Sequence, residues 1–200
     1  MDNLLPVMEC FYSLQGEGVF AGHAAYFIRL AGCDVGCFWC DVKESWNKDL
    51  HQKQAISKIV EKASSYPTRL IIITGGEPLM HNLDWLTEAL KKKEFTIHIE
   101  TSGAYPLSGK LDWITLSPKR FKKPVQEIYQ KANELKIIVY SLSDLEFAKQ
   151  ESQKVSTSCK LLLQPEWSKS DKILPLLIEF VKENPQWQIS LQTHKYLGIE

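Results

Sequence analysis

The chain has 200 residues, a length typical of one domain rather than several. Hydrophobic residues make up 44% of it, enough to bury a core without cross-links, and 24 basic residues balance 24 acidic ones. This balance argues against a bulk electrostatic partner, so we expect no nucleic-acid or membrane ligand. The first residues show no signal-peptide pattern and no apolar run approaches ~20 residues, so we expect a cytoplasmic protein.

Short β-rich runs alternate with longer amphipathic runs, which is typical of βα units around a largely parallel sheet. The predicted strands are 7–13, 25–30, 70–74, 96–100, 113–116, 135–139, 160–164 and 188–192. The predicted helices are roughly 51–64, 80–93, 124–133, 143–151 and 170–183. In the first helix, Ile56, Ile59, Val60 and Ala63 recur with helical spacing. The runs "LIIIT" and "KIIVY" are continuously apolar, as expected of strands covered on both faces.

The length also limits the fold. A closed eightfold barrel typically needs about 250 residues, so this chain favours an α/β fold that is either an incomplete (partial) TIM-like barrel or an open sheet. In both folds, sites gather at the carboxyl ends of the strands. Glycine, proline or polar residues follow nearly every predicted strand, in "LQGEG" (14–18), "GGEP" (75–78), "TSG" (101–103), "SPK" (117–119) and "PEW" (165–167). We expect these loops to share one rim of the sheet.

Three of the five cysteines, Cys33, Cys37 and Cys40, fall within eight residues with the spacing C-x3-C-x2-C. The odd cysteine count and the expected reducing compartment argue against a disulfide framework. A structural zinc site usually takes four ligands, but Cys10 and Cys159 are distant in sequence and the histidines are scattered singly. An iron–sulfur cluster held by three thiolates leaves one iron free to bind another molecule, and this interpretation fits the spacing best.

At this point the motifs resemble a known superfamily. "CDVGCFWC" resembles the cysteine signature of radical S-adenosylmethionine (SAM) enzymes, and "TGGEP" resembles their second motif. The resemblance implies a [4Fe–4S] cluster ligated by Cys33, Cys37 and Cys40, whose open iron binds the amino and carboxylate groups of SAM. It further implies that an electron from the cluster cleaves SAM, giving a 5'-deoxyadenosyl radical that removes hydrogen from the substrate.

Further blocks resemble the 7-carboxy-7-deazaguanine synthase family. These are "ECFYSLQGEGVFAG", "FIRLAGC", "CDVKESW", "IETSG", "LSPK" and "QTHKYLGI", which together span nearly the whole chain. The resemblance implies ring contraction of 6-carboxy-5,6,7,8-tetrahydropterin to 7-carboxy-7-deazaguanine with loss of ammonia, in the biosynthesis of queuosine or related 7-deazapurines. It also implies a single radical SAM domain over 1–200, a homodimer, and a reducing electron donor such as a flavodoxin or ferredoxin.

The same resemblance implies binding residues at matching positions. The substrate-binding set is Leu14, Gln15, Gly16, Arg29 and Thr74, with Gln192 and His194 closing over the pterin. The SAM-binding set is Trp39, Asp41, Gly76, Ser117, Pro118 and Lys119, with Glu100, Ser102 and Gln164 as further candidates. Arg29 has the geometry to bind a pterin carboxylate bidentately, and its alternative role is a structural ion pair. The alternative for His194 is an exposed residue near the chain end.

One position departs from the family. Val42 stands where the family usually has Thr or Ser after "CD", whose hydroxyl contributes to a Mg2+ site that bridges to the substrate. Magnesium prefers oxygen ligands and often keeps several waters. Two alternatives follow: a water completes the Mg2+ site, or the enzyme depends on Mg2+ only weakly. We expect activity to rise little when Mg2+ is added after chelation.

Two other functions stay open at the level of sequence. A small radical SAM activase, which makes a glycyl radical on a partner protein, has a similar length and an open cluster, but it has no need of "LQGEG" or Arg29. A zinc-stabilised binding protein without catalysis would use the same cysteines to hold Zn2+. Cys10 and Cys159 are expected to be buried structural thiols.

Overall fold

The computed structural model describes residues 3–199, and their strands form one nine-stranded sheet. The strands are β1 (Leu4–Leu14), β2 (Ala24–Leu30), β3 (Lys53–Ala55), β4 (Leu70–Gly75), β5 (Thr96–Thr101), β6 (Trp113–Leu116), β7 (Glu134–Val139), β8 (Lys160–Pro165) and β9 (Trp187–Ile189). Their order across the sheet is β3-β1-β2-β4-β5-β6-β7-β8-β9. Strands β2 and β4 to β9 pair in parallel, whereas β1 runs antiparallel to both β2 and β3.

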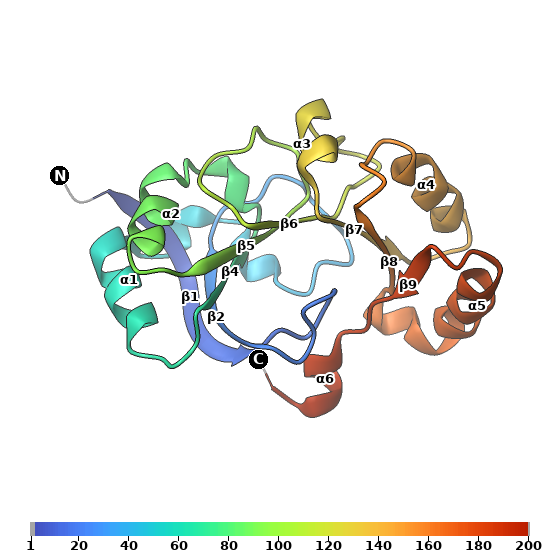
Figure 1. The fold of residues 1–200 in the computed structure, drawn as a ribbon, viewed down its shortest axis with the longest axis horizontal. Helices are drawn as coiled ribbons and strands as arrows, with labels where there is room; N and C mark the ends of the chain where they lie inside the picture. Colours follow the sequence, from blue (N-terminus) through green and yellow to red (C-terminus); the bar gives the residue numbers. More distant parts are fainter. Residues whose placement is uncertain (1–2, 200) are drawn as a thin grey trace.

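The sheet is curved but does not close. Figure 1 shows the strands in an arc, with α1, α2, α3, α4 and α5 outside it and loops inside it. Strands β3 and β9 form the two edges. Consecutive parallel strands lie side by side and their crossover helices cover one face, as in a βα barrel. The predicted incomplete TIM-like barrel with a largely parallel sheet is therefore confirmed.

The helices confirm most of the predicted segments. They are α1 (Ile56–Ser64), α2 (Asp84–Lys91), α3 (Gln126–Lys131), α4 (Ser143–Ser152), α5 (Ser170–Glu183) and α6 (Thr193–Leu197). Helix α1 buries the stripe of residues that its spacing predicted. The longest helix, α5, has 14 residues, and within residues 3–199 no helix is long and apolar enough to cross a membrane.

Several predicted boundaries are wrong. Residues 53–55 pair with β1 as β3, so the helix predicted from 51 begins only at Ile56. The helix predicted from 80 begins at Asp84, because residues 78–80 form a 3-10 turn and Asn82 Oδ1 accepts a hydrogen bond from the Asp84 amide. The strand predicted at 188–192 ends at Ile189, and helix α6 was not predicted.

The two faces of the sheet bury different side chains. The outer face packs against the helices through apolar residues such as Ile71, Ile73 and Ile137. Alternate residues point to the concave side, where a small apolar cluster around Phe27 and Ile72 adjoins polar groups. The buried polar residues of this side are His98, Thr115, Glu134, Lys136, Gln164 and Ser190. "LIIIT" and "KIIVY" are covered on both faces as predicted, although the second begins with a buried lysine.

The loop at 15–23 enters the concave side from the amino ends of the parallel strands. Because β1 is antiparallel to β2, this loop leaves the sheet at the end opposite the cysteine loop. The Gly18 amide donates to Ser190 Oγ at 3.0 Å, and the Val19 amide donates to Glu134 Oε2 at 3.2 Å. The expectation that "LQGEG" shares one rim with the other loops is therefore wrong.

Phe20, at the tip of this loop, closes the bottom of the barrel. Its ring centroid lies 4.4 Å from that of His98 and 5.0 Å from that of Trp113, both edge to face. Such pairs add to the stability that apolar burial provides. The loop thus takes the place of core side chains that would fill the interior of a closed barrel.

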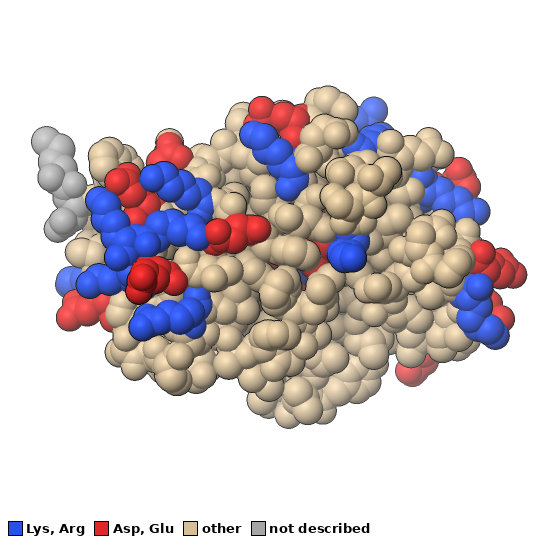
Figure 2. All heavy atoms as spheres, in the orientation of Figure 1, with Lys and Arg blue, Asp and Glu red and all other residues tan. Residues whose placement is uncertain are grey.

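The surface charge is mixed in sign. Figure 2 shows Lys and Arg interspersed with Asp and Glu, most densely over α1 and α2, with few charged groups toward the centre of this face. This distribution agrees with the equal numbers of acidic and basic residues, 24 each. Charge of one sign does not dominate the face shown, so bulk electrostatics gives this face no preference for a polyanion.

Replacing His98 with Phe should flatten the pH dependence of the unfolding free energy between pH 6.5 and about 4. Burial lowers the pKa of His98 from 6.5 to about 4. The folded state therefore keeps a neutral imidazole while the unfolded chain takes up a proton as the pH falls below 6.5. This one group costs the fold up to about 3 kcal/mol across that window.

Chemical denaturation at a series of pH values measures the effect. A H98F protein with the same pH dependence as the wild type would contradict the assigned burial cost.

Candidate active site

A cavity of about 550 Å³ lies on the concave side, at the carboxyl ends of the parallel strands. Its wall contains residues from the loops after β2, β4, β5, β6 and β8, together with the 15–23 loop and the C-terminal segment. The predicted site residues that line it are Leu14, Gln15, Gly16, Arg29, Cys33, Cys37, Trp39, Cys40, Asp41, Thr74, Gly76, Glu100, Ser102, Ser117, Lys119, Gln164, Gln192 and His194. Pro118 is buried behind the wall. A concave, partly apolar cavity with convergent polar groups is typical of a small-molecule site.

The three cysteines lie in the loop that follows β2, and backbone bonds fix the start of this loop. The Gly32 amide donates to the Ser45 carbonyl at 2.6 Å, and the Cys33 amide donates to the Trp46 carbonyl at 3.1 Å. The amide of Cys40 donates to the carbonyl of Cys37 at 3.0 Å. The loop therefore folds back on residues 45–46 and directs its cysteines into the cavity.

The three thiols fit a cluster with one open position. None forms a disulfide, and all three are partly exposed in the same cavity. Burial raises the pKa of the Cys37 thiol, Lys119 opposes this shift, and the nearby Cys40 and Cys33 add to it, so the thiols lie within electrostatic reach of one another. Within residues 3–199, no three His, Cys, Asp or Glu side chains lie close enough together to hold a metal ion. The match between the three thiols and a cluster therefore rests on the kind of ligand and on the cavity that they share.

The other two cysteines lie away from this loop. Cys159 is buried in the outer core and Cys10 packs against that core. Burial raises the pKa of Cys159 to about 12 and also raises the pKa of Cys10, which makes both thiols poor ligands and poor nucleophiles. The expectation of a buried thiol is confirmed for Cys159, whereas Cys10 is only partly buried, and no fourth cysteine completes the set in the cavity.

The two glycines of "TGGEP" lie directly against the backbone that leads into the cysteine loop. Gly75 has φ of +146°, and a Cβ there would lie 2.0 Å from the Leu30 carbonyl oxygen. A Cβ on Gly76 would lie 2.4 Å from the Gly32 carbonyl oxygen and 2.7 Å from Cys33 Cβ. Only glycine permits this approach, so the two motifs are in contact rather than merely near one another.

Glu77 then anchors the same turn to the loop after β5. Its side chain is 1% exposed and accepts a hydrogen bond from the Leu79 amide at 3.1 Å and one from Thr101 Oγ1 at 2.5 Å. Its other oxygen accepts from the Ser102 amide at 2.8 Å and from the Ser102 hydroxyl. A buried carboxylate with this many donors is well satisfied, so Glu77 is an anchor of the cavity wall.

Lys136 lies deeper in the cavity and joins three segments. Its side chain is 5% exposed and forms ion pairs with Glu17 of the 15–23 loop and with Glu100 of β5, the latter at 3.2 Å. Gln15 Nε2 donates to the other oxygen of Glu100 at 2.9 Å. Burial disfavours the Lys136 ammonium, but the Glu100 and Glu17 carboxylates outweigh it and raise its pKa above the usual range. The network holds "LQGEG" against the sheet.

The C-terminal segment closes one side of the cavity. The Thr193 amide and hydroxyl both donate to the Gly16 carbonyl, at 2.8 and 2.9 Å. Gln192 Nε2 donates to Glu17 Oε1 at 2.9 Å. The His194 ring lies so close to Gly16 that a Cβ there would meet its Nδ1 at 2.1 Å. His194 is thus part of the cavity wall, and the alternative of an exposed end residue is wrong.

Arg29 and Thr74 lie side by side on β2 and β4, as the strand register dictates. Arg29 Nε donates to Glu9 Oε1 at 2.6 Å, and its guanidinium lies 5.7 Å from the Phe11 ring centroid. The structural ion pair that the sequence left as an alternative therefore exists. Among the described residues no partner is recorded for the terminal nitrogens of Arg29, and the side chain lines the cavity.

The predicted SAM-binding residues, apart from Pro118, line the same cavity as the cysteines. Trp39 stacks edge to face on Phe38 with ring centroids 4.5 Å apart. Lys119 Nζ donates to the carbonyl and hydroxyl of Ser117, each at 2.7 Å. Burial lowers the pKa of Lys119, and the neighbouring Cys37 opposes that shift. Gln164 Oε1 accepts from Ser190 Oγ at 2.8 Å, which orients its amide.

Sequence reasoning missed several residues of the wall. Glu17, Glu77, Lys136 and Lys195 all line the cavity, yet none was predicted as a site residue. The signal for Lys136 was a lone charge at the start of an apolar strand, which is rarely buried without a partner. The signal for Glu77 was its place between two glycines and a proline that hold a tight turn.

The fold and this cavity define the class of protein. A partial βα barrel carries three unpaired cysteines in the loop after its first parallel strand, in contact with a glycine turn after the next strand. Residues 27–143 match the Radical SAM superfamily. Proteins of this superfamily use a [4Fe–4S] cluster and SAM, and the three thiols in the cavity are the donor set that such a cluster needs.

Relatives define the family further. The chain is 53% identical to the 7-carboxy-7-deazaguanine synthase of Flavobacterium psychrophilum over 98% of this chain and 93% of the relative. It is 48% identical to that of Synechocystis over 97% and 93%, respectively. The crystal structure of QueE from Escherichia coli superposes with a TM-score of 0.86 at 33% identity, covering 96% of this chain and 95% of that one. The chain belongs to the 7-carboxy-7-deazaguanine synthase family.

Gly76→Ala should prevent normal loading of the iron–sulfur cluster. The added Cβ would displace the Gly32 carbonyl and Cys33 and so disturb the ligand loop. Iron and labile sulfide measured after anaerobic reconstitution should fall well below the wild-type value of about four per chain. The control is Gly22→Ala, because a Cβ at Gly22 meets nothing within 4 Å although its φ is +88°. Normal iron content in G76A would contradict the proposed contact.

Lys136→Met should destabilise the fold by about 3–5 kcal/mol, because it leaves two carboxylates in the cavity without their counter-charge. Denaturant titration near neutral pH measures the loss. The matched control is Lys182→Met, which removes a lysine whose side chain is 66% exposed from its pair with Glu179 and should cost less than about 1 kcal/mol. Equal losses in the two variants would contradict the assigned role of Lys136.

Proposed function

We propose that the chain is a radical SAM lyase that converts 6-carboxy-5,6,7,8-tetrahydropterin to 7-carboxy-7-deazaguanine with loss of ammonia, in queuosine or related 7-deazapurine biosynthesis. The observation that carries the proposal is the shared cavity. Three unpaired thiols line one part of it, and a polar wall built from the 15–23 loop, β5, β7 and the C-terminal segment lines another. Family membership supplies the reaction that this cavity is proposed to perform.

Cys33, Cys37 and Cys40 are proposed to hold the cluster. When bound, the cluster and SAM supply an electron and a carbon radical that removes hydrogen from the substrate. Aromatic side chains pack edge to face beside the loop, Phe38 against Trp39 and Tyr140, and Trp39 against Phe121. The protein's contribution at this end of the cavity is to hold the three thiols in one loop.

The proposed SAM-binding residues follow the cysteine loop around the rim. They are Trp39, Asp41, Gly76, Glu100, Ser102, Ser117, Pro118, Lys119 and Gln164, of which all but Pro118 line the cavity. Backbone and hydroxyl groups after the strand ends are suited to hydrogen-bond the polar groups of a nucleoside. Because Pro118 is buried behind the wall, its proposed role is to hold the backbone between Ser117 and Lys119.

The proposed substrate-binding residues line the same cavity and contact the SAM-binding set through the Gln15–Glu100 and Gln192–Asp41 hydrogen bonds. Leu14, Gln15, Gly16, Arg29, Thr74, Gln192 and His194 come from β1, the following loop, β2, β4 and the C-terminal segment. Arg29 offers its terminal nitrogens to a carboxylate while Glu9 fixes its Nε. Gln15 and Gln192 are held by Glu100 and Glu17, so their amides are oriented before a ligand arrives.

Further parts of the proposal concern partners and cofactors. We propose one radical SAM domain over the whole chain, a homodimer, a cytoplasmic location in line with unpaired cysteines, and a reductant such as a flavodoxin or ferredoxin. Mg2+ is left out of the proposed cofactor set, because Val42 offers no oxygen where a hydroxyl would be needed. Weak Mg2+ dependence stays a prediction.

Anaerobic reconstitution followed by turnover tests the proposed function. The holoenzyme, with SAM, a strong one-electron reductant and 6-carboxy-5,6,7,8-tetrahydropterin, should release 7-carboxy-7-deazaguanine and ammonia in equal amounts. Cys33→Ala, Cys37→Ala and Cys40→Ala should each abolish product, whereas Cys159→Ala, in the outer core, should keep the wild-type iron content.

The same experiment separates the two other functions. A glycyl-radical activase would cleave SAM under these conditions but give no ring-contracted product. A zinc-stabilised binding protein would be colourless, would contain zinc in place of iron, and would leave SAM intact. Either result would contradict the proposed function.

A further inference from the structure

Lys195 is a cation of the cavity wall for which no role was predicted from the sequence. Its Nζ donates to Asp41 Oδ2 at 2.8 Å, and Gln192 Nε2 reaches the same oxygen at 3.3 Å. The ammonium also lies 5.1 Å from the centroid of the Trp167 ring. It therefore stands between the C-terminal segment and the residue that follows Cys40, with one donor used on Asp41 and two further donors available.

This position coincides with the departure from the family at Val42. Asp41 and Val42 both line the cavity, but the side chain of Val42 carries no oxygen. Ser45, the nearest hydroxyl along the chain, is buried and donates to the Val42 carbonyl at 2.7 Å. An ammonium already neutralises Asp41, so a divalent cation there would meet a like charge as well as a missing ligand.

The other carboxylates of the cavity are engaged as well. Glu17 and Glu100 share Lys136, and Glu77 accepts four bonds from residues 79, 101 and 102. Glu166 accepts from the amide and hydroxyl of Ser168, at 3.1 and 2.6 Å. Every carboxylate of the cavity wall thus has protein donors, and the residues present do not fit a Mg2+ site.

The basic side chains of the cavity differ in how many of their hydrogen-bond donors are used by protein partners. Lys136 is held by two carboxylates and is 5% exposed. Lys119 is turned toward Ser117, beside Cys37 at the cluster end. Arg29 is bound through Nε to Glu9. Lys195, whose side chain is 21% exposed, pairs among residues 3–199 with one carboxylate, that of Asp41, which uses one of its three donors.

We propose that Lys195 is a substrate-binding residue whose ammonium contacts the carboxylate of the substrate beside Asp41, in place of a divalent cation. The inference rests on the proposed carboxypterin substrate. Asp41 and Trp167 hold the ammonium in position. A charge-assisted hydrogen bond of this kind is stronger than a neutral one and gives preference for an anionic ligand.

The test compares two ligands that differ only in the carboxylate. Calorimetric titration uses the anaerobic holoenzyme with SAM but no reductant, so no turnover occurs, and measures Kd for 6-carboxy-5,6,7,8-tetrahydropterin and for 5,6,7,8-tetrahydropterin. Lys195→Met should lower the preference for the carboxylated ligand by about tenfold or more. Lys195→Arg, which keeps the charge, should retain most of it.

The matched variants separate binding from support of the C-terminal segment. Asp41→Asn weakens the bond that positions the Lys195 ammonium but leaves the charge, so it should lower the preference less than Lys195→Met does. Lys182→Met removes an exposed lysine of α5 and should leave both Kd values unchanged. If Lys195→Met weakened both ligands equally, or neither, Lys195 would only tie down the segment and the inference would be overturned.

Mg2+ provides the second arm of the test. After chelation, adding Mg2+ to the wild-type holoenzyme should change Kd for the carboxylated ligand by no more than about twofold. Tightening of about tenfold or more would show that a metal ion supplies the charge and would overturn the inference.

The turnover assay keeps the two proposals distinguishable. Wild-type product formation together with an unaltered preference in K195M overturns the role of Lys195 alone. Absence of both product and ligand binding in the wild type overturns the proposed function and this inference with it.

Discussion

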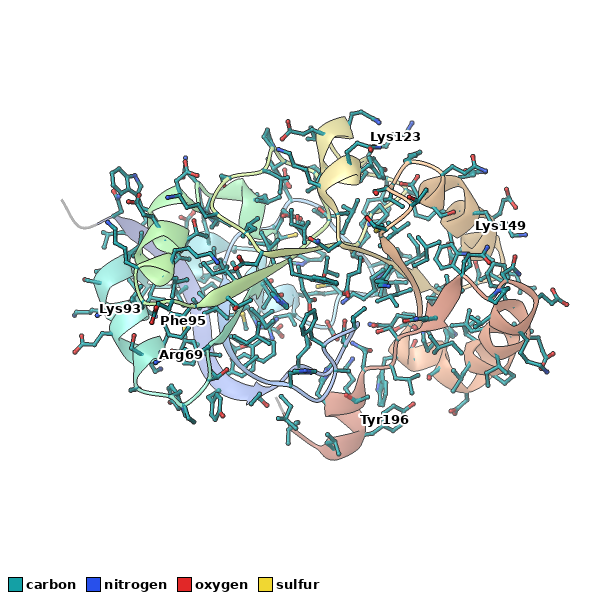
Figure 3. All side chains as sticks on the ribbon, in the orientation of Figure 1. Arg69, Lys93, Phe95, Lys123, Lys149 and Tyr196 are labelled. Atoms are coloured by element: carbon teal, nitrogen blue, oxygen red, sulfur yellow. The ribbon has the colours of Figure 1, made fainter. Side chains whose placement is uncertain are left out.

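The ion pairs of Lys136 join segments that lie far apart in the sequence, and the floor of the cavity depends on them. Glu17 comes from the 15–23 loop and Glu100 from β5, while Lys136 lies on β7. Burying three charges is costly unless they satisfy one another, so such a network favours one arrangement of its segments over others. Glu17 also accepts a hydrogen bond from Gln192, which connects the network to the C-terminal segment. Tyr196, labelled in Figure 3, marks helix α6 of this segment.

The opposite end of the cavity depends on a different constraint, the close backbone approach between the glycine turn after β4 and the start of the cysteine loop. Gly76 lies against Gly32 and Cys33, and Glu77 ties the same turn to Thr101 and Ser102. The cavity is thus bounded by backbone contact at the cluster end and by a buried charge network at the substrate end. This division suits a site in which a reactive cofactor and a polar, anionic substrate are held side by side.

The sequence predicted the elements whose signal is local. Continuous apolar runs marked β4 and β7, and the spacing of Ile56, Ile59, Val60 and Ala63 marked the buried face of α1. The cysteine spacing and the glycine turn marked the cluster end, because a ligand loop and a close backbone approach demand those residue types. Most predicted site residues line one cavity for the same reason: carboxyl ends of parallel strands meet at one edge.

The features that were not predicted from the sequence depend on contacts between distant segments. Strand β3 has three residues and exists through its pairing with β1, and α6 is short and held by Gly16. The end of the sheet at which "LQGEG" lies could not be predicted, because no local sequence pattern shows that β1 is antiparallel to β2. Lys136 and Lys195 acquire their roles only from partners more than 30 residues away in sequence, Glu100 and Asp41 among them. Short-range patterns carry no information on such pairs.

The most direct test of the account follows hydrogen from the substrate into the cofactor. Turnover uses 6-carboxytetrahydropterin deuterated on its saturated ring carbons, with the holoenzyme, SAM and a one-electron reductant, and mass spectrometry of the 5'-deoxyadenosine and SAM pools. The account predicts deuterium in the 5'-deoxyadenosyl group together with 7-carboxy-7-deazaguanine, and neither in the Cys37→Ala protein. Cleavage of SAM without deuterium transfer and without that product would contradict it.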